Sequence, residues 1–148
     1  MTEMTAEILF LRYAYPCINS KWGQEMPGEH RLEIEAAVFE GKQPRRKTIK
    51  FHFPRAFKAL RELGEQTERD PWHIENVIDY WHSHQGMGPA CAVIQMTVLH
   101  AQPADQAAPP AAMLQNGSKQ IPMNNTYRLE LKPGDKVYTH QAHIIEKA

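Results

Sequence analysis

Residues 70–101, DPWHIENVIDYWHSHQGMGPACAVIQMTVLHA, contain the change that decides the fold. The first part of this stretch has the apolar spacing of an amphipathic helix, i, i+3, i+4 and i+7. Four residues occupy these positions: Ile74, Val77, Ile78 and Trp81. Asp70 can accept hydrogen bonds from first-turn amides, and Pro71 has the backbone torsion that a first helical residue needs. Together these features predict a helix that begins at residues 70–71.

The second part of the same stretch has the composition of a strand. Two glycines and a proline in residues 86–89 interrupt the helical pattern, since neither residue type continues a helix readily. The following run, CAVIQMTVLHA at residues 91–101, is apolar and rich in β-branched side chains, which is typical of a strand. We therefore predict a helical part at residues 1–88 and a small β part at residues 89–148.

Further helices are predicted before residue 70 from the same apolar spacing. They are TAEILFLRYAY between Thr5 and Pro16, GEHRLEIEAAVFEG at residues 28–41, and PRAFKALRELG at residues 54–64. Thr5 is a candidate N-cap, while Pro16, Gly41 and Gly64 predict helix ends. TIKFHF at residues 48–53 alternates, and it fits either a strand or the start of the helix that follows.

The β part is predicted to contain paired strands and one long loop. Residues 127–131, YRLEL, alternate, and KPGD at residues 132–135 supplies the proline and glycine of a turn. Residues 136–147 then continue as one bent strand or two short ones. Residues 102–126 carry four prolines and little periodicity, which predicts a long surface loop whose shortening costs little stability. The whole pattern predicts an α+β protein, with a helical N-terminal part followed by a small antiparallel β-barrel.

Composition predicts a cytoplasmic globular protein. The chain has 148 residues, a hydrophobic fraction of 42% and a formal net charge of zero. No apolar run reaches the length of a membrane span, and the N-terminus lacks the basic start of a signal peptide. Two cysteines cannot form a disulfide framework, so we expect reduced thiols. Zero net charge provides no general attraction to nucleic acid or to an anionic membrane.

One basic segment departs from this neutral average. KQPRRKTIK at residues 42–50 has five basic residues in nine. A solvated turn and helix start is the ordinary interpretation. The alternative is a module that binds single-stranded nucleic acid, since a barrel can combine basic side chains with aromatic stacking platforms. The candidate residues for this alternative are Arg45, Arg46, Lys47, Lys50 and Phe51.

The junction near residues 80–91 also contains candidate metal ligands. His82, His84 and Cys91 carry imidazole and thiol groups that suit zinc, iron or nickel. On an intact helix, however, His82 and His84 point about 200° apart, and their spacing to the cysteine matches no established zinc pattern. A helix C-terminus with imidazoles that offset the helix dipole is the simpler interpretation. Cys91 is either a buried small apolar residue or a thiol exposed at the mouth of the barrel.

Catalytic motifs are weakly represented. The sequence contains no G-x-S-x-G, no H-E-x-x-H and no phosphate-binding glycine loop. Glu75, Asp79 and His82 lie at i, i+4 and i+7, which predicts a surface ion-pair ladder rather than acid–base catalysis. A non-enzymatic protein is therefore expected, and a metal-dependent enzyme that uses His82, His84 and Cys91 is the last alternative.

Residues 134–148, GDKVYTHQAHIIEKA, resemble the closing strands of the HypC/HupF hydrogenase-maturation chaperones. The family pattern is approximately G-D-Y-V-L-V-H-x-G-x-A-I. Five residues fall on it without a gap: Gly134, Asp135, Val137, His140 and Ile145. The chain departs from the family at the late glycine, where it has Ala142, and at an early proline, where it has Gln95. The family cysteine follows the initiator methionine, whereas Cys91 is internal.

This resemblance implies a fold and a function. The family fold is a small OB-like β-barrel, and its first strand opens on a cysteine that helps to carry an iron precursor. By resemblance, Cys91 would hold iron or another transition metal transiently, with His82, His84 and His140 as neighbouring candidates. The leading hypothesis is a cytoplasmic, non-enzymatic maturation chaperone for a metalloenzyme such as a nickel–iron hydrogenase. Its partner would be that metalloenzyme or another maturation factor. Nucleic acid is the less favoured partner, and no binding to a membrane is expected.

Overall fold

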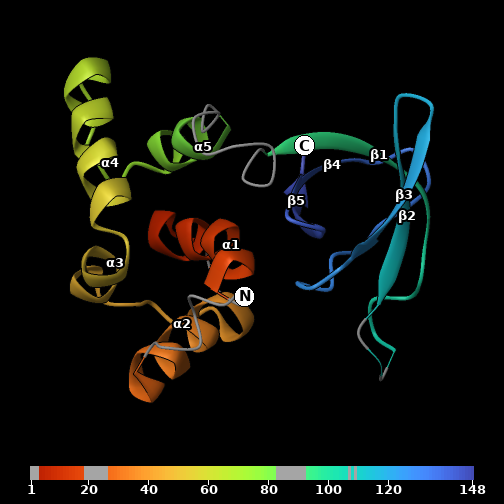
Figure 1. Ribbon diagram of the computed structural model, residues 1–148, viewed down its shortest axis with the longest axis horizontal. Coiled ribbons are helices and arrows are strands. Elements are labelled where there is room, and N and C mark those ends of the chain that lie inside the picture. Colours follow the sequence, from red (N-terminus) through yellow and green to blue (C-terminus); the bar gives the residue numbers. More distant parts are fainter. Residues whose placement is uncertain (1–3, 19–26, 83–92, 107, 109) are drawn as a thin grey trace. The chain divides into compact units, whose positions relative to one another are not determined.

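The computed structural model describes residues 4–18, 27–82, 93–106, 108 and 110–148 (Figure 1). Contacts divide the chain into two compact units, Met1–Ser83 and His84–Ala148. The described helices lie in the first unit and the described strands in the second, which confirms the predicted order of an α+β protein. None of the described helices is long and apolar enough to cross a membrane.

Five helices form the first unit, which we call the helical unit. They are α1 (Ala6–Ile18), α2 (Gly28–Glu40), α3 (Arg46–His52), α4 (Pro54–Thr67) and α5 (Ile74–His82). Each of the predicted helices is present, and α3 assigns most of the ambiguous residues 48–53 to a helix. Thr5 caps α1 as predicted, since its Oγ1 accepts a hydrogen bond from the backbone N–H of Ile8 at 3.3 Å.

The predicted helix ends at Pro16 and Gly64 are wrong. Pro16 lies within α1, which continues to Ile18. A proline so close to the end of a helix disturbs little of the hydrogen-bond ladder. Helix α4 runs through Gly64 to Thr67 and ends at Glu68, which has a left-handed φ of 57°. Gly64 is buried, and a Cβ there would lie 2.8 Å from the carbonyl oxygen of Arg69. Close packing, rather than helix termination, therefore explains this glycine.

We expect Gly64→Ala to lower the free energy of unfolding by about 2 kcal/mol, because the new methyl group would lie 2.8 Å from the carbonyl oxygen of Arg69 and 3.2 Å from the nitrogen of Pro71, so backbone atoms would have to shift. This cost outweighs the higher helix propensity of alanine, which is about 1 kcal/mol. Urea unfolding of the full chain measures the difference. Gly28→Ala is the matched control, since a Cβ at Gly28 meets nothing within 4 Å. A Gly64→Ala protein as stable as wild type would contradict the close-packing explanation.

The start of α5 also differs from the prediction. Asp70 accepts a hydrogen bond from the backbone N–H of Trp72 at 2.8 Å, but the residues that follow form a turn and the helix begins at Ile74. The side-chain amide of Asn76 donates to the carbonyl oxygen of Asp70 at 3.1 Å. Asp70 therefore fixes the turn between α4 and α5 rather than the first turn of α5.

The core of the helical unit is built around α1. Six residues of this helix are at most 2% exposed: Ile8, Leu9, Phe10, Leu11, Tyr13 and Ala14. A helix that is apolar on all sides is expected to be enclosed by its neighbours, and α1 contacts both α2 and α5. The Phe10 ring lies 5.4 Å from Trp81 and 5.5 Å from Phe53 between ring centroids. This aromatic cluster connects three segments of the unit.

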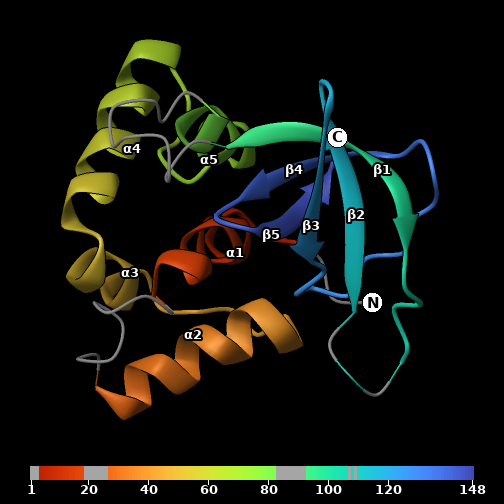
Figure 2. The same cartoon turned by 45° about the vertical axis from the view of Figure 1, so that its right-hand side comes forward.

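Five strands form the second unit and close into a ring, which we call the strand ring (Figure 2). They are β1 (Ile94–Ala101), β2 (Ala111–Asn116), β3 (Lys119–Asn124), β4 (Lys136–His140) and β5 (His143–Lys147). Their order is β1-β2-β3-β5-β4, and β4 pairs with β1 to complete the ring. The prediction of a wholly antiparallel sheet is wrong at one place, because β3 and β5 pair in parallel at Asn124 and His143.

The predicted long loop at residues 102–126 is wrong, because it contains β2 and β3. These strands form a hairpin whose two-residue turn is Gly117 and Ser118, and Gly117 has a φ of +62°. Gly117 followed by Ser118 is a two-residue hairpin signal that outweighs the prolines. Pro122 lies in β3, which pairs with β5 only at its end, and proline is tolerated on such strand edges. Deletion of residues 105–118 would therefore remove β2 and is not expected to be tolerated.

The predicted strand at residues 127–131 is also absent. This segment is irregular, and Arg128 has a φ of 52°. Leu129 and Leu131 alternate because both pack against the core of the ring. The buried amide of Asn125 fixes the segment, since it donates to the carbonyl oxygen of Leu129 and accepts from its N–H, both at 2.9 Å. An irregular segment whose two leucines pack on the core thus has the alternation of a strand.

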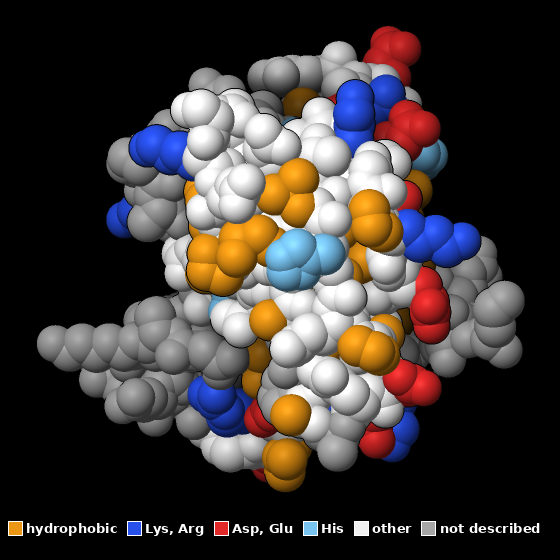
Figure 3. Space-filling view, turned by 90° about the vertical axis from the view of Figure 1, so that its right-hand side faces the viewer, with side chains coloured by type: hydrophobic (Ala, Val, Ile, Leu, Met, Phe, Trp, Pro, Cys, Tyr) orange, Lys and Arg blue, Asp and Glu red, His pale blue; other side chains and the backbone are white. Residues whose placement is uncertain are grey.

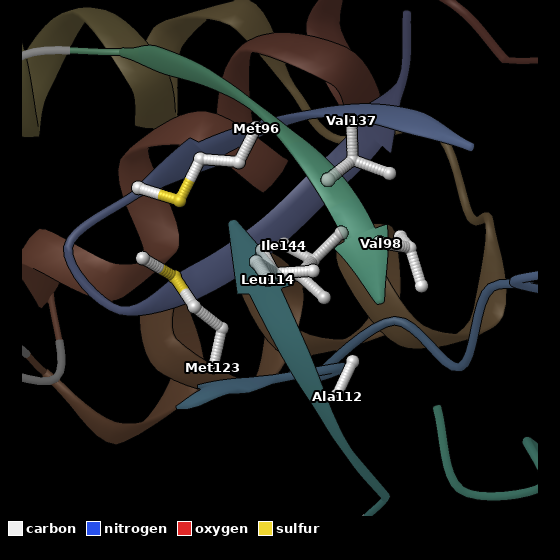
Figure 4. Packing of buried hydrophobic residues seen from close by; sticks show 7 residues of the cluster. All are labelled: Met96, Val98, Ala112, Leu114, Met123, Val137 and Ile144. Atoms are coloured by element: carbon white, nitrogen blue, oxygen red, sulfur yellow. The ribbon is translucent and has the colours of Figure 1, made fainter. Parts of the chain in front are cut away.

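The core of the strand ring is a small cluster of inward-facing side chains (Figure 4). Its members are Met96, Val98, Ala112, Leu114, Met123, Val137 and Ile144. Val98, Leu114 and Ile121 are direct cross-strand partners on β1, β2 and β3. All five strands contribute to this cluster, which holds the ring closed.

Candidate functional site

The predicted metal ligand His82 has a structural partner within the helical unit. It is the last residue of α5, and its Nε2 lies 3.1 Å from the hydroxyl of Tyr13. Tyr13 is fully buried and stacks on Trp81, with ring centroids 5.7 Å apart. A buried phenol needs a hydrogen-bond partner, and His82 supplies it. This contact gives His82 a role in packing that requires no metal.

The other predicted ligands lie either in the second unit or outside the described residues. His140 is the last residue of β4 in the strand ring and is 1% exposed. His84 and Cys91 lie outside the described residues. Within the described part of the chain, no three side chains of the metal-binding types are grouped so that they could hold an ion.

The two carboxylates of the predicted ladder, Glu75 and Asp79, form surface ion pairs, but the structure pairs both with an arginine that the prediction did not include. Arg69, in the turn before α5, lies 3.5 Å from Glu75 and 3.2 Å from Asp79. Both carboxylates are more than half exposed, so these pairs contribute little to stability. Their arrangement fits a solvated helix surface and supplies no catalytic pair.

Two of the five predicted nucleic-acid contacts are used inside the helical unit. The Arg45 guanidinium donates to Glu33 on α2 at 2.8 Å, and its backbone N–H donates to the same carboxylate at 2.7 Å. Arg46 lies 3.6 Å from Glu7, which is buried, and its guanidinium lies 5.7 Å from the centre of the Trp72 ring. These two arginines join α3 to its neighbours.

The electrostatics of Glu33 follow from these contacts. Burial alone would raise its pKa, but hydrogen bonds from the Arg45 side chain and backbone and from Thr48 lower the pKa to about 2. Because the pKa in the folded protein lies below the ordinary value of 4.5, ionised Glu33 stabilises the fold above that value. This contribution is lost as the pH falls from about 4.5 towards 2.

We expect Glu33→Gln to lower the free energy of unfolding by about 2 kcal/mol at neutral pH, because it removes hydrogen bonds to a charged acceptor. The difference from wild type should shrink as the pH falls from about 5 to 2, where Glu33 itself becomes protonated. Urea unfolding at a series of pH values measures this. Arg45→Gln should show the same convergence, and a difference that stays constant over this range would contradict the role of the pair.

The remaining predicted contacts face solvent. Lys47 and Lys50 are exposed on α3, and Phe51 is 69% exposed. The Lys50 ammonium lies 5.5 Å from the centre of the Phe57 ring on α4. The exposed cations continue along α4 as Arg55, Lys58 and Arg61, which the prediction missed. The signal that could have found them is the absence of any Asp or Glu between residues 42 and 61.

A second surface is formed by the outer side of β1, β2 and β3. Its residues form two cross-strand rows defined by strand register. One row is Thr97, Gln115 and Gln120, and the other is His100, Met113 and Pro122. We call these six residues the outer face. Figure 3 views this side: hydrophobic side chains and a histidine occupy its middle, and Lys, Arg, Asp and Glu side chains lie toward its margins.

The outer face belongs to a segment that is unusually poor in charge. Residues 93–126 contain only Asp105 and Lys119 as charged residues, and they contain no aromatic residue. A surface strand normally carries charged side chains, because they keep an exposed sheet soluble and separate. Neither row of the outer face contains an acidic residue, a lysine or an arginine.

The turn between β4 and β5 has two residues in a left-handed conformation. Gln141 has a φ of 49° and Ala142 a φ of 66°, and they connect the paired residues His140 and His143. The His143 side chain makes a short hydrogen bond to the hydroxyl of Thr126, and burial lowers its pKa. Left-handed torsions are unfavourable for alanine, because its Cβ crowds the backbone.

Comparison with known proteins adds no family to this description. No family model matches the chain, and neither a curated protein nor a solved structure matches it significantly.

Proposed function

We propose that this chain is a non-enzymatic accessory protein whose strand ring binds a partner protein through the outer face. The observation that carries the proposal is the lack of charge on two neighbouring cross-strand rows of an exposed sheet. The centres of protein interfaces are depleted of charged residues and enriched in methionine. The complementary partner surface would be apolar and uncharged, and it would bury the row that contains Met113.

We also propose that the strand ring is an OB-like barrel. In support, the ring has five strands in which β1 pairs with both β2 and β4, and β3 meets β5. Such a barrel commonly uses the face of its second and third strands to bind ligands. In this chain the outer face offers no aromatic platform and no lysine or arginine, so it suits a protein better than stacked bases.

A narrower proposal is that the accessory role is metalloenzyme maturation, in the cytoplasm, as the resemblance to the HypC/HupF chaperones implies. One structural feature supports the resemblance. Ala142 occupies the position of the family glycine, and its φ of 66° is a torsion that favours glycine. The partner would be a metalloenzyme such as a nickel–iron hydrogenase, or another maturation factor, and Cys91 would hold iron transiently as cargo.

We expect Ala142→Gly to raise the free energy of unfolding by about 0.5–1 kcal/mol, because glycine adopts the left-handed torsion without steric cost. The gain is less than the full strain, since glycine also increases the freedom of the unfolded chain. Thermal unfolding followed by circular dichroism measures the change. Ala108→Gly, at an exposed position outside the strands, is the control and should give no gain. A destabilised Ala142→Gly protein would contradict the assigned torsion.

Binding of a purified partner tests the main proposal. The protein that co-purifies with the full chain in its natural host is produced separately, and the affinity is measured by calorimetry. Met113→Arg places a cation in the centre of the outer face and should weaken binding at least about tenfold, because it buries an unpaired charge. Glu130→Arg changes an exposed residue outside the outer face and should leave the affinity unchanged. Equal affinities for the two variants would overturn the proposal.

Iron loading tests the narrower proposal without a partner. The chain is incubated with ferrous iron under anaerobic conditions, and bound iron is measured after desalting. The chain has two cysteines, Cys17 and Cys91, so each serves as the control for the other. Cys91→Ser should lose the bound iron and Cys17→Ser should retain it. Retention of iron by Cys91→Ser would end the metal-carrier proposal and leave the protein-binding proposal intact.

A further inference from the structure

The zero net charge of the chain conceals a strong separation of charge within the helical unit. Residues 42–61 contain eight basic residues and no acidic residue. The rest of residues 1–83 contains four basic and thirteen acidic residues. The balance of charge over the whole chain therefore says nothing about the field near α3 and α4, and a local basic surface attracts anions over about one Debye length, roughly 8–10 Å.

Three of these eight cations already have acidic partners. Arg45 pairs with Glu33, Arg46 lies 3.6 Å from Glu7, and Lys42 lies 3.8 Å from Glu40. The other five are exposed, and the structure records no ion pair between them and any described residue. They are Lys47, Lys50, Arg55, Lys58 and Arg61. We call these five residues the basic helix surface.

The five cations follow two consecutive helices. Only Phe53 separates α3 from α4, and the two helices follow one another in Figure 1. Lys50 reaches across this joint, because its ammonium lies 5.5 Å from the Phe57 ring. On α4 the cations recur every third residue, which spaces them about 4.5 Å along the helix axis. The arrangement is a line of positive charge rather than an isolated pair.

An exposed aromatic side chain stands beside this line. Phe51 is 69% exposed and lies one turn from Lys47 on α3. Its ring makes edge contacts with two imidazoles, at 5.8 Å from His30 and 5.0 Å from His52 between ring centroids. These histidines are themselves joined by a hydrogen bond of 2.8 Å between α2 and α3. The Phe51 ring is thus held by two perpendicular imidazole rings, while the residue remains 69% exposed to solvent.

We infer that the basic helix surface binds single-stranded nucleic acid, with the five cations on the phosphates and a base stacked on Phe51. A positive track beside an aromatic ring is the arrangement by which proteins bind single strands without sequence preference. An acidic protein would satisfy the cations but would make no particular use of an open aromatic ring. This inference is independent of the proposed protein partner, since the residues lie in the helical unit and not in the strand ring.

Fluorescence anisotropy with a labelled oligothymidylate of about 20 nucleotides tests the inference over about 50–200 mM salt. The combined variant Lys50→Ala, Lys58→Ala and Arg61→Ala should bind at least about tenfold more weakly, and its salt dependence, the slope of log K against log salt, should fall by about 2. The control removes three exposed lysines of the strand ring, Lys119, Lys132 and Lys136, and so changes the net charge equally. It should bind like wild type.

Phe51→Ala distinguishes nucleic acid from other polyanions. It should weaken oligothymidylate binding about fivefold or more, without changing the salt slope, because it removes a stacking platform and no charge. Binding of inorganic polyphosphate should be unaffected by this variant. Equal binding by the two triple variants, or no binding at about 50 mM salt, would overturn the inference. An unchanged oligothymidylate affinity in Phe51→Ala would overturn the stacking of a base on this ring and leave a surface that binds any polyanion by charge alone.

Discussion

Leu114→Ala is expected to lower the free energy of unfolding of the strand ring by about 3–5 kcal/mol. Leu114 is fully buried and sits on β2 between Val98 and Ile121, its direct partners on the adjacent strands. The ring has a small core, and a core of this size supplies only about 3–5 kcal/mol of net stability. Loss of this one side chain should therefore leave the ring largely unfolded at ambient temperature.

The measurement can separate the two units, because all three tryptophans lie in residues 1–83. Far-ultraviolet circular dichroism should report the loss of strands in Leu114→Ala, while tryptophan fluorescence should keep the wild-type unfolding midpoint. Met113→Ala, on the same strand with its side chain on the outer face, is the matched control and should cost less than about 1 kcal/mol. A Leu114→Ala protein with native strand content and unchanged stability would contradict the assigned core.

Phe10→Ala is expected to lower the free energy of unfolding of the helical unit by about 3–5 kcal/mol. Phe10 is fully buried, and its ring lies 5.8 Å from Trp72 and 5.4 Å from Trp81 between ring centroids. Removing the ring leaves a cavity that the surrounding aromatic side chains cannot fill without moving.

Tryptophan fluorescence under urea measures this loss directly, since two of the three indoles contact the deleted ring. Phe51→Ala is the control, because its ring is 69% exposed, and it should cost less than about 1 kcal/mol. Equal midpoints for Phe10→Ala and Phe51→Ala would show that α1 is not the centre of the helical core.

The sequence predicted the helices better than the strands for a physical reason. The position of a helix follows from residues that are close in the sequence, through apolar spacing and caps such as Thr5. Each predicted helix is present. The strands β2 and β3 are short, and their hairpin is completed by pairing with β1 and β5, which lie outside the predicted loop. The prolines around β2 favoured a loop, although Gly117 and Ser118 carried the hairpin signal. Residues 127–131 alternate because Leu129 and Leu131 pack on the core of the ring, while hydrogen bonds to the Asn125 side chain replace strand pairing.

The candidate sites were predicted less well, because both surfaces depend on register and on ion pairing. His82 was identified as a metal ligand from its residue type, but its partner Tyr13 is 69 positions away. Arg45 and Lys47 look equivalent in the sequence, but Glu33 forms an ion pair with Arg45 and not with Lys47. The outer face required the pairing of β1 with β2 and β3, since no single strand shows that Met113 lies between His100 and Pro122.

Site-specific photo-crosslinking tests directly whether the outer face contacts a partner protein. A photoreactive amino acid is placed at Met113 or at His100 of the full chain in its natural host, and also at Glu130 as a control outside the outer face. We expect one discrete protein adduct from both outer-face positions and none from position 130. An adduct from position 130 alone, or no adduct from positions 100 and 113 while the chain is folded and expressed, would contradict it.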